Sequence, residues 1–236
     1  VCNVMALLQR SVKRILAYSS IAHSGYMIVG LIAGPQESTS GLAAILFYLL
    51  CYGVMNLGAF GVVACLEYNK DGKREEVEDI DDLRGLVRSR PALGITMVVC
   101  SLSLLGLPIL LGFMGKLFLF ASGISAGEIA LVVVMAINSA IGAYYYLRLA
   151  FFPLLESRDE DAEPMQTSPY LSRTIASVIS AGGVLVLIPL TQTLWTQAES
   201  AATFAEPTVT VSAEPKELPL DEQQAVIELV RSINER

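Results

Sequence analysis

Charged residues are scarce in this sequence. Asp, Glu, Lys and Arg make up 17% of the 236 residues, whereas hydrophobic residues make up 53%. Soluble domains usually carry about 25% charged and about 45–50% apolar residues. The scarcity of charge therefore argues against a soluble enzyme and against a protein that binds nucleic acid. It favours a chain that crosses a lipid bilayer several times.

The motifs of several enzyme classes are missing as well. The chain has a single histidine, and its four cysteines show no CxxC spacing, which argues against a metal site and against a disulfide framework. It contains no GxGxxG, P-loop, HExxH or GxSxG motif. We therefore expect this chain to bind no cofactor and no metal. It begins at Val1 without a signal peptide, and we interpret it as a piece of a longer protein.

The apolar residues are concentrated in five long runs. A helix needs about 20 mainly apolar residues to cross a membrane. We therefore predict an all-α polytopic membrane protein with about five transmembrane helices within residues 1–197. An acidic tail, residues 198–236, follows with a linker and a short amphipathic helix. The predicted spans are residues 15–33, 42–66, 93–120, 129–152 and 175–195, the third of which is long enough to be broken at Pro108.

The positions of Lys and Arg predict how the chain is oriented. Twelve basic residues lie on one side of the predicted spans, whereas the alternate loops, residues 34–41 and 121–128, contain none. Basic loops generally face the cytoplasm. We expect the loop at 67–90 to be cytoplasmic and the C-terminal tail to lie on the opposite side. The net charge of −7 comes from loops and tail, so the membrane part is slightly basic.

Lys116 is the most informative candidate, because it lies inside the third span. A lysine in the middle of a span costs at least about 2.5–3.5 kcal/mol, so it usually faces protein or water. Pro108 removes a helix hydrogen bond and frees the carbonyl of Leu104. At helical spacing Pro108, Gly112 and Lys116 share one face, which predicts a broken helix that carries an ion site. The alternative is that Lys116 only extends to the nearby membrane surface.

The first span carries a second polar track. Ser20 lies on the face of Lys13, and His23 is about a quarter turn away. A histidine titrates near neutral pH, which suits a proton relay, although a lone histidine is more often a hydrogen-bonded structural residue. Lys13 is equally ambiguous, because with its neighbour Arg14 it also forms an ordinary positive cluster at a membrane surface.

Two aromatic groups have simpler interpretations. Tyr48, Tyr52 and Asn56 follow one another at i, i+4 and i+8 in the second span, before Gly58 and Gly61. We interpret this pattern as close helix packing through small residues, with the polar groups paired across helices. Tyr144, Tyr145 and Tyr146 precede Arg148 near the end of the fourth span. Tyrosines at such a place are typical of the aromatic belt at a membrane surface.

Five segments of the sequence resemble a known family of membrane proteins. The first, residues 9–26, reads QRSVKRILAYSSIAHSGY and is similar to a segment LKRLLAYSSIxHxGY. That segment belongs to the antiporter-like membrane subunits of respiratory complex I, and the resemblance is strongest to the subunit N group of bacterial NADH:quinone oxidoreductase. The other four segments, in the same order as in that family, are residues 48–60, 82–91, 106–116 and 138–148.

The resemblance implies a fold of fourteen helices with two inverted repeats of five, to which this chain would contribute helices ten to fourteen. Lys116 matches the lysine of the broken twelfth helix, which is linked to the proton half-channel facing the periplasm. Lys13 and His23 match a lysine and a histidine of helix ten. The glutamate of helix five and the lysines of helices seven and eight have no counterpart here. Ile109 departs from the family, where a second proline often follows Pro108, and the acidic tail matches nothing in it.

The implied function is that of a proton-translocating membrane subunit of NADH:quinone oxidoreductase, which couples quinone reduction to proton transfer through intramembrane lysines. The chain would be a multi-pass protein of the inner (plasma) membrane. It would belong to a translocase enzyme without a redox site of its own, since NADH, FMN, iron–sulfur clusters and quinone would be bound by partner subunits. The alternatives are a subunit of a cation/proton antiporter assembly with the same scaffold, and a purely structural membrane anchor.

Overall fold

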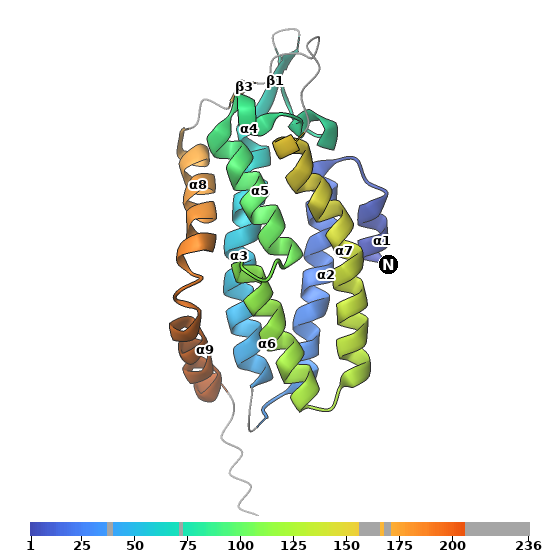
Figure 1. The fold of residues 1–236 in the computed structure, drawn as a ribbon, viewed down its shortest axis with the longest axis vertical. Coiled ribbons are helices and arrows are strands. Elements are labelled where there is room, and N and C mark those ends of the chain that lie inside the picture. The colour runs from blue at the N-terminus through green and yellow to red at the C-terminus, as the bar shows by residue number, and fades with distance from the viewer. Residues whose placement is uncertain (37–39, 71–72, 156–165, 168–170, 206–236) are drawn as a thin grey trace, which may run out of the picture. The chain divides into compact units, whose positions relative to one another are not determined.

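The computed structural model describes residues 1–36, 40–70, 73–155, 166–167 and 171–205. Over these residues the chain is a bundle of helices (Figure 1), and the predicted class of a helical membrane protein is confirmed. Three of the described helices are long and apolar enough to cross a membrane: α2 (Val12–Ala33), α3 (Gly41–Cys65) and α7 (Ile129–Leu155). The same ranges also contain α1 (Cys2–Leu7), α4 (Leu86–Ser89), α5 (Pro91–Leu105), α6 (Leu111–Ser125), α8 (Leu171–Val186) and α9 (Thr191–Ala205).

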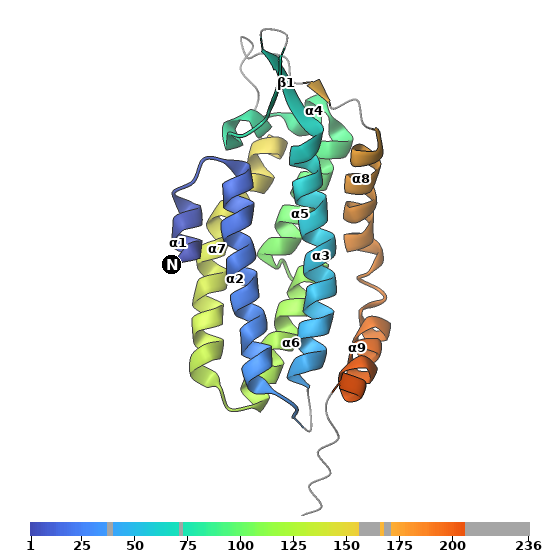
Figure 2. The ribbon, with the colours of Figure 1, turned by 180° about the vertical axis from the view of Figure 1, so that it is seen from behind.

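Helix α3 occupies the centre of the packing. It contacts α2, α5, α6, α8 and α9, and Figure 2 shows it among these helices from behind. Its large side chains Phe47, Tyr48 and Met55 are at most 1% exposed. The helix begins after Ser40, whose hydroxyl accepts a hydrogen bond from the N–H of Ala43 and so satisfies one donor of the first turn.

Helix α2 begins earlier than the apolar run predicts. Lys13 and Arg14, which the sequence places before the first span, lie in its first turn. The physical reason is a contact with the loop that follows α3, because the N–H of Val12 donates to the carbonyl of Glu78 at 2.8 Å. The loop thus satisfies one of the backbone donors that a helix start leaves open.

The third predicted span is broken into α5 and α6, as the sequence predicts. Gly106 ends α5 with a φ of 91°, a left-handed conformation that favours glycine. The expectation that Pro108 shares a helical face with Gly112 and Lys116 is wrong. The helix is interrupted between them, so Pro108 lies in the exposed connection while Gly112 and Lys116 belong to α6.

The fifth predicted span is bent. Helices α8 and α9 meet at an angle of 94°, with Pro189 in the connection, where its missing N–H cannot continue a helix. Helix α9 continues to Ala205, so the start of the predicted tail at residue 198 lies inside a helix. The rest of that tail, including the predicted amphipathic helix, lies outside the described residues.

The prediction of five crossings therefore counts two broken helix pairs as one span each. Helices α5 and α6 are apolar, but each is shorter than a full span. They follow one another along the bundle in Figure 1, so together they traverse the length that α3 crosses alone. Helices α8 and α9 are long and apolar enough to cross a membrane only when the bent pair is taken together.

The loop at 67–90 contains structure that no sequence pattern indicated. Strand β1 (Leu66–Lys70) pairs antiparallel with β2 (Lys73–Glu76) on one side and with β3 (Gln166–Thr167) on the other. The short 3-10 helix η1 (Ile80–Leu83) follows and buries its two apolar ends. These strands are short and rich in charge and lack the alternation of apolar residues that predicts a half-buried strand.

Replacing Gly112 with alanine is expected to destabilise the break between α5 and α6. A Cβ at this position would lie 1.9 Å from the carbonyl oxygen of Ser103 and 2.9 Å from the Sδ of Met55. Overpacking of this kind costs about 1–3 kcal/mol. Thermal unfolding of the intact protein in detergent should show Gly112→Ala melting below the wild type.

Gly25→Ala is the matched control, because a Cβ at Gly25 meets nothing within 4 Å. Alanine also favours a helix over glycine by about 1 kcal/mol. The control should melt at or above the wild-type temperature. Equal melting temperatures for the two variants would contradict the close approach of α5 and α6.

Candidate functional site

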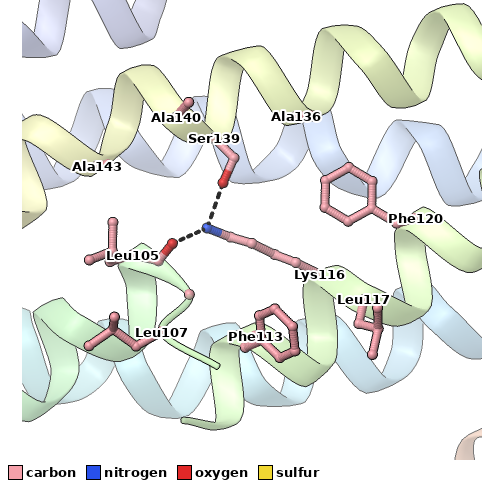
Figure 3. Close-up of a pocket in the computed structure, with 11 residues that line it drawn as sticks. Leu105, Leu107, Phe113, Lys116, Leu117, Phe120, Ala136, Ser139, Ala140 and Ala143 are labelled. Atoms are coloured by element: carbon pink, nitrogen blue, oxygen red, sulfur yellow. Dashed lines mark hydrogen bonds between the residues drawn. The ribbon is translucent and has the colours of Figure 1, made fainter. Parts of the chain in front are cut away.

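A lysine ammonium fills the gap between α5 and α6. Lys116, in the second turn of α6, is 6% exposed. Its Nζ donates hydrogen bonds to the carbonyl oxygens of Leu104 at 3.0 Å and Leu105 at 2.8 Å, and to the Oγ of Ser139 on α7 at 3.0 Å. Figure 3 shows the side chain reaching from α6 to the end of α5 and to α7. The alternative in which Lys116 extends to the membrane surface does not account for this arrangement.

The two carbonyl groups are free because α5 ends there. The last four carbonyls of a helix have no partner within it, and Leu104 and Leu105 belong to that last turn. Pro108 has no N–H that could bond to Leu104. The C-terminal end of a helix also carries a partial negative charge, which favours a cation. The break therefore provides both the acceptors and the field that a buried ammonium needs.

The site satisfies all three donors of the ammonium with neutral oxygens. Within the described ranges no carboxylate forms an ion pair with Lys116, and the ion pairs found there include Arg10 with Asp79, Arg84 with Asp81 and Arg173 with Glu67. A neutral amine would find partners here too. It can donate to the two carbonyls and accept a hydrogen bond from the hydroxyl of Ser139, because a serine both donates and accepts. The same three oxygens can therefore hold Lys116 with or without its extra proton.

A cavity of about 430 Å³ adjoins the amine. It lies between the α5–α6 break and α7, as Figure 3 shows. Lys116 and Ser139 are the polar side chains among its lining residues, and the rest of the wall is apolar or aromatic, including Phe113 and Phe120. Such a space gives the buried amine an approach from outside the helix pair.

His23 forms the centre of a second buried polar group. It is 1% exposed, and both nitrogens of its ring face tyrosine hydroxyls. Nδ1 lies 2.5 Å from the hydroxyl of Tyr48, and Nε2 lies 2.6 Å from the hydroxyl of Tyr146. The ring of Tyr52 stacks on the imidazole with 4.8 Å between the ring centres. His23 thus fits the structural interpretation of a satisfied histidine, while its two partners leave the relay interpretation open.

Tyr26 lies between the two groups. Its ring centre is 5.7 Å from the Nζ of Lys116 and 5.3 Å from the imidazole centre of His23. A cation within about 6 Å of an aromatic ring is attracted by it. The fold therefore brings both Lys116 and His23 within about 6 Å of the ring centre of one tyrosine.

The other predicted site residues lie elsewhere. Lys13 is half-buried in the first turn of α2. The rise of an α-helix places it about 20 Å along the axis from Tyr26, the residue of α2 whose ring adjoins Lys116. Pro108 is exposed in the connection, and Gly112 is buried at the start of α6, where its N–H donates to the Oγ of Ser103 at 3.1 Å.

The sequence interpretation missed part of the site. Tyr145 and Tyr146 are not members of a surface belt, since they are 1% and 2% exposed, and only Tyr144 is exposed. The hydroxyl of Tyr145 donates to the Oδ1 of Asn3 at 2.8 Å, and Asn3 in turn donates to Asn138. The available signal is helical spacing. Tyr145 and Tyr146 lie within two turns of Ser139, whose hydroxyl bonds to Lys116.

No group of three or more His, Cys, Asp or Glu side chains that could hold a metal occurs in the described ranges. The four cysteines are free, and Cys51, Cys65 and Cys100 are buried. The hydrogen-bonding chemistry of the site is therefore that of lysine, histidine, tyrosine, serine and backbone carbonyls.

Comparison with known protein families finds a match over residues 1–142 to a transmembrane family described as NADH:quinone oxidoreductase/Mrp antiporter. NADH-quinone oxidoreductase subunit N of Salinibacter ruber is 47% identical over 191 residues, which cover 78% of this chain and 37% of that protein. The NADH-quinone oxidoreductase subunit N of Myxococcus xanthus is 37% identical over 208 residues, which cover 78% of this chain and 40% of that protein. The chain thus spans well under half the length of these relatives.

Solved structures agree with this similarity. A chain of respiratory complex I from Thermus thermophilus with bound aureothin is 35% identical, with a TM-score of 0.69, over 83% of this chain and 42% of that one. A chain of the Mrp complex from Dietzia sp. DQ12-45-1b has a TM-score of 0.68 over 88% of this chain and 45% of that one. Its identity is 20%, so it shows a shared fold and no more.

Ser139→Ala should destabilise the protein through Lys116. Alanine removes one of three acceptors from a buried ammonium, and a hydrogen bond to a charged group contributes about 1.5–3 kcal/mol. Ser122→Ala is the matched control, because the hydroxyl of Ser122, which is buried, bonds to Leu119 in its own helix. Thermal unfolding of the intact protein in detergent should show the larger loss for Ser139→Ala. An equal or smaller loss would contradict the assigned hydrogen bond to Lys116.

Proposed function

Because the chain belongs to the NADH:quinone oxidoreductase/Mrp antiporter transmembrane family, we propose that it is part of a proton-translocating membrane subunit of an NADH:quinone oxidoreductase. The family membership confirms the resemblance that the five sequence segments predicted. It identifies an antiporter-like membrane protein, and proton transfer through its lysines is the proposed step beyond that.

The observation that carries the proposal is the coordination of Lys116. A buried ammonium costs several kcal/mol of desolvation even after the protein relaxes around it. Here that cost is offset by three neutral oxygens and not by a carboxylate. When a proton leaves, no counter-ion is left behind as a buried negative charge. Lys116 can therefore alternate between the charged and the neutral form without rearranging its helix.

The other residues have supporting roles in this proposal. The break at Gly106–Leu110 exposes the carbonyls that bind the amine, and Gly112 lets the start of α6 approach α5 closely. His23 contacts Tyr26, which also adjoins Lys116, and extends the polar track to the tyrosine hydroxyls around it. Lys13 lies in the first turn of α2, where it would exchange protons closer to the loops.

The remaining chemistry belongs to other subunits. The relatives are named as subunits of NADH-quinone oxidoreductase, and the similar solved chains belong to membrane complexes. We place NADH, FMN, the iron–sulfur clusters and quinone in partner subunits, with the membrane subunits and the lipid bilayer as direct partners of this chain. Quinone reduction there would change the electrostatic field at Lys116 and so drive its proton on and off.

The orientation in the membrane is part of the same proposal. The basic residues gather at the end of the bundle that carries the sheet and α4, which Figure 1 shows opposite the α6–α7 connection. Basic loops generally stay in the cytoplasm. We place residues 67–90 on the cytoplasmic side of the inner (plasma) membrane and the C-terminal tail on the other side.

A second candidate is a subunit of a cation/proton antiporter assembly that does not oxidise NADH. It is favoured by the family description, which includes Mrp antiporters, and by the fold shared with the Mrp complex. The identity of 35% to a complex I chain, against 20% to the Mrp chain, favours the oxidoreductase. Purification of the native assembly separates the two, since only the oxidoreductase brings flavin and iron–sulfur subunits with it.

Lys116→Ala in the full-length subunit should lower the number of protons pumped per quinone reduced. The reason is that alanine leaves the cavity and the helix break but removes the group that carries the proton. The measurement is proton uptake by vesicles that contain the assembled complex, together with the rate of quinone reduction. Leu117→Ala is the control, because Leu117 is next to Lys116 in the sequence and its side chain is 44% exposed.

Unchanged pumping per quinone in Lys116→Ala would refute the role of this lysine. If Lys116→Leu also left assembly and coupling intact, the chain would be a structural membrane anchor. That outcome would leave the family assignment untouched.

A further inference from the structure

Three side chains from three helices form an unbroken hydrogen-bonded row. Tyr48 on α3, His23 on α2 and Tyr146 on α7 are 0%, 1% and 2% exposed. The hydroxyl of Tyr48 is 2.5 Å from Nδ1 of the imidazole, and the hydroxyl of Tyr146 is 2.6 Å from Nε2. Each ring nitrogen thus has one hydroxyl partner.

The chemistry of imidazole fixes the direction of these bonds. A neutral imidazole carries a proton on one nitrogen and a lone pair on the other. One tyrosine must therefore donate its proton to the ring, while the other must accept the ring N–H and keep its own proton for a further partner. The row has a direction, and exchanging the tautomer of His23 reverses it.

We infer that Tyr48, His23 and Tyr146 form a proton relay in which the imidazole passes a proton from one tyrosine hydroxyl to the other. This inference rests on the proposed proton-translocating function. It assigns the two tyrosines as the groups that deliver the proton to His23 and remove it.

The transfer balances without a net charge on the ring. The O–H bond of Tyr48 breaks as Nδ1–H forms, and Nε2–H breaks as a new O–H bond forms at Tyr146. Tyr146 gives its original proton to a water molecule at its end of the row, and Tyr48 regains one from a hydronium ion at the other end. The ring ends in its other tautomer, so it must return before a second proton moves in the same direction. The opposite starting tautomer gives the reverse transfer.

The row lies next to the proposed proton carrier. The ring of Tyr48 packs against Gly115, the residue before Lys116, since a Cβ there would be 2.6 Å from the Cδ2 of Tyr48. Tyr146 has its neighbour Tyr145 at a ring distance of 4.5 Å. The hydroxyl of Tyr145 bonds to Asn3, which in turn bonds to Asn138 beside Ser139. Polar groups thus adjoin the relay at its Tyr146 end, and at its Tyr48 end the ring packs directly against the helix that carries Lys116.

Tyr52 provides a built-in contrast. It is on the same helix as Tyr48 and stacks on the same imidazole at 4.8 Å. Its hydroxyl, however, donates to the Oγ of Ser20 at 2.7 Å and does not contact the ring nitrogens. Removing the hydroxyl of Tyr52 disturbs the packing around His23 no more than removing that of Tyr48 or Tyr146. Unlike those two changes, it leaves the relay intact.

The test compares Tyr48→Phe, Tyr146→Phe, their double variant, Tyr52→Phe and Lys116→Ala. Each is made in the assembled oxidoreductase and reconstituted in vesicles. Protons pumped per quinone reduced are measured in H₂O and in D₂O. We expect both single relay variants to lose as much pumping as Lys116→Ala, because a series of transfers stops wherever it is broken. For the same reason the double variant should lose no more than either single one, and Tyr52→Phe should pump like the wild type.

The outcomes separate the relay from the proposed function. If Lys116→Ala lowers pumping while the relay variants behave like Tyr52→Phe, the relay is wrong and the function of Lys116 stands. If the relay variants lower pumping and Lys116→Ala does not, the relay stands and the role of Lys116 falls. If none of these variants lowers pumping, both are wrong. Losses that add in the double variant would overturn the relay, since independent packing defects add and broken series do not.

A variant that fails to assemble is replaced by 3-fluorotyrosine at the same position. This residue keeps the hydroxyl and the packing of the ring but holds its proton less tightly. The relay predicts a changed pumping rate and a changed ratio of the rates in H₂O and D₂O at positions 48 and 146 and not at position 52. Unchanged rates at positions 48 and 146 would overturn it.

Discussion

The contact between the ammonium of Lys116 and the last carbonyls of α5 is the interaction on which the site depends. It requires the helix to end at Gly106, to resume at Leu111 and to leave room for a long side chain between. The ammonium in turn satisfies carbonyls that α5 leaves without a backbone partner, and in a bilayer an unpaired backbone group costs several kcal/mol. The broken helix and the buried charge therefore stabilise each other.

The neutral ligands of this lysine explain how a fixed scaffold can serve a mobile proton. A carboxylate partner would bind the ammonium more strongly, but it would remain as an unpaired buried charge once the proton had left. Two carbonyls and the hydroxyl of Ser139 avoid that state, because the hydroxyl can turn from acceptor to donor. The same flexibility belongs to the tyrosine hydroxyls around His23. Groups that both donate and accept are therefore the common element of the two polar centres.

Local features of the fold were predictable from the sequence, and contacts between distant residues were not. Apolar runs locate the helices, and Pro108 locates the break and the free carbonyl of Leu104, because both effects act within a few residues. Ser139 was not identified as a partner of Lys116, since a separation of 23 residues shows no periodicity that links them. The sequence pattern wrongly places Tyr146 at the membrane surface for a related reason. Position along a helix predicts depth, but only packing decides which side chains face inward.

Chemical restoration of the amine tests the central claim most directly. Lys116→Cys is made in a background whose four native cysteines are replaced by alanine, and it is treated with 2-bromoethylamine, which rebuilds an amine of nearly the length of lysine. The cavity beside the site gives the reagent access. The account predicts that pumping per quinone is lost in Lys116→Cys and returns with the amine, but not after alkylation with iodoacetamide, which adds a neutral group. Full pumping in the untreated variant, or equal recovery with both reagents, would contradict it.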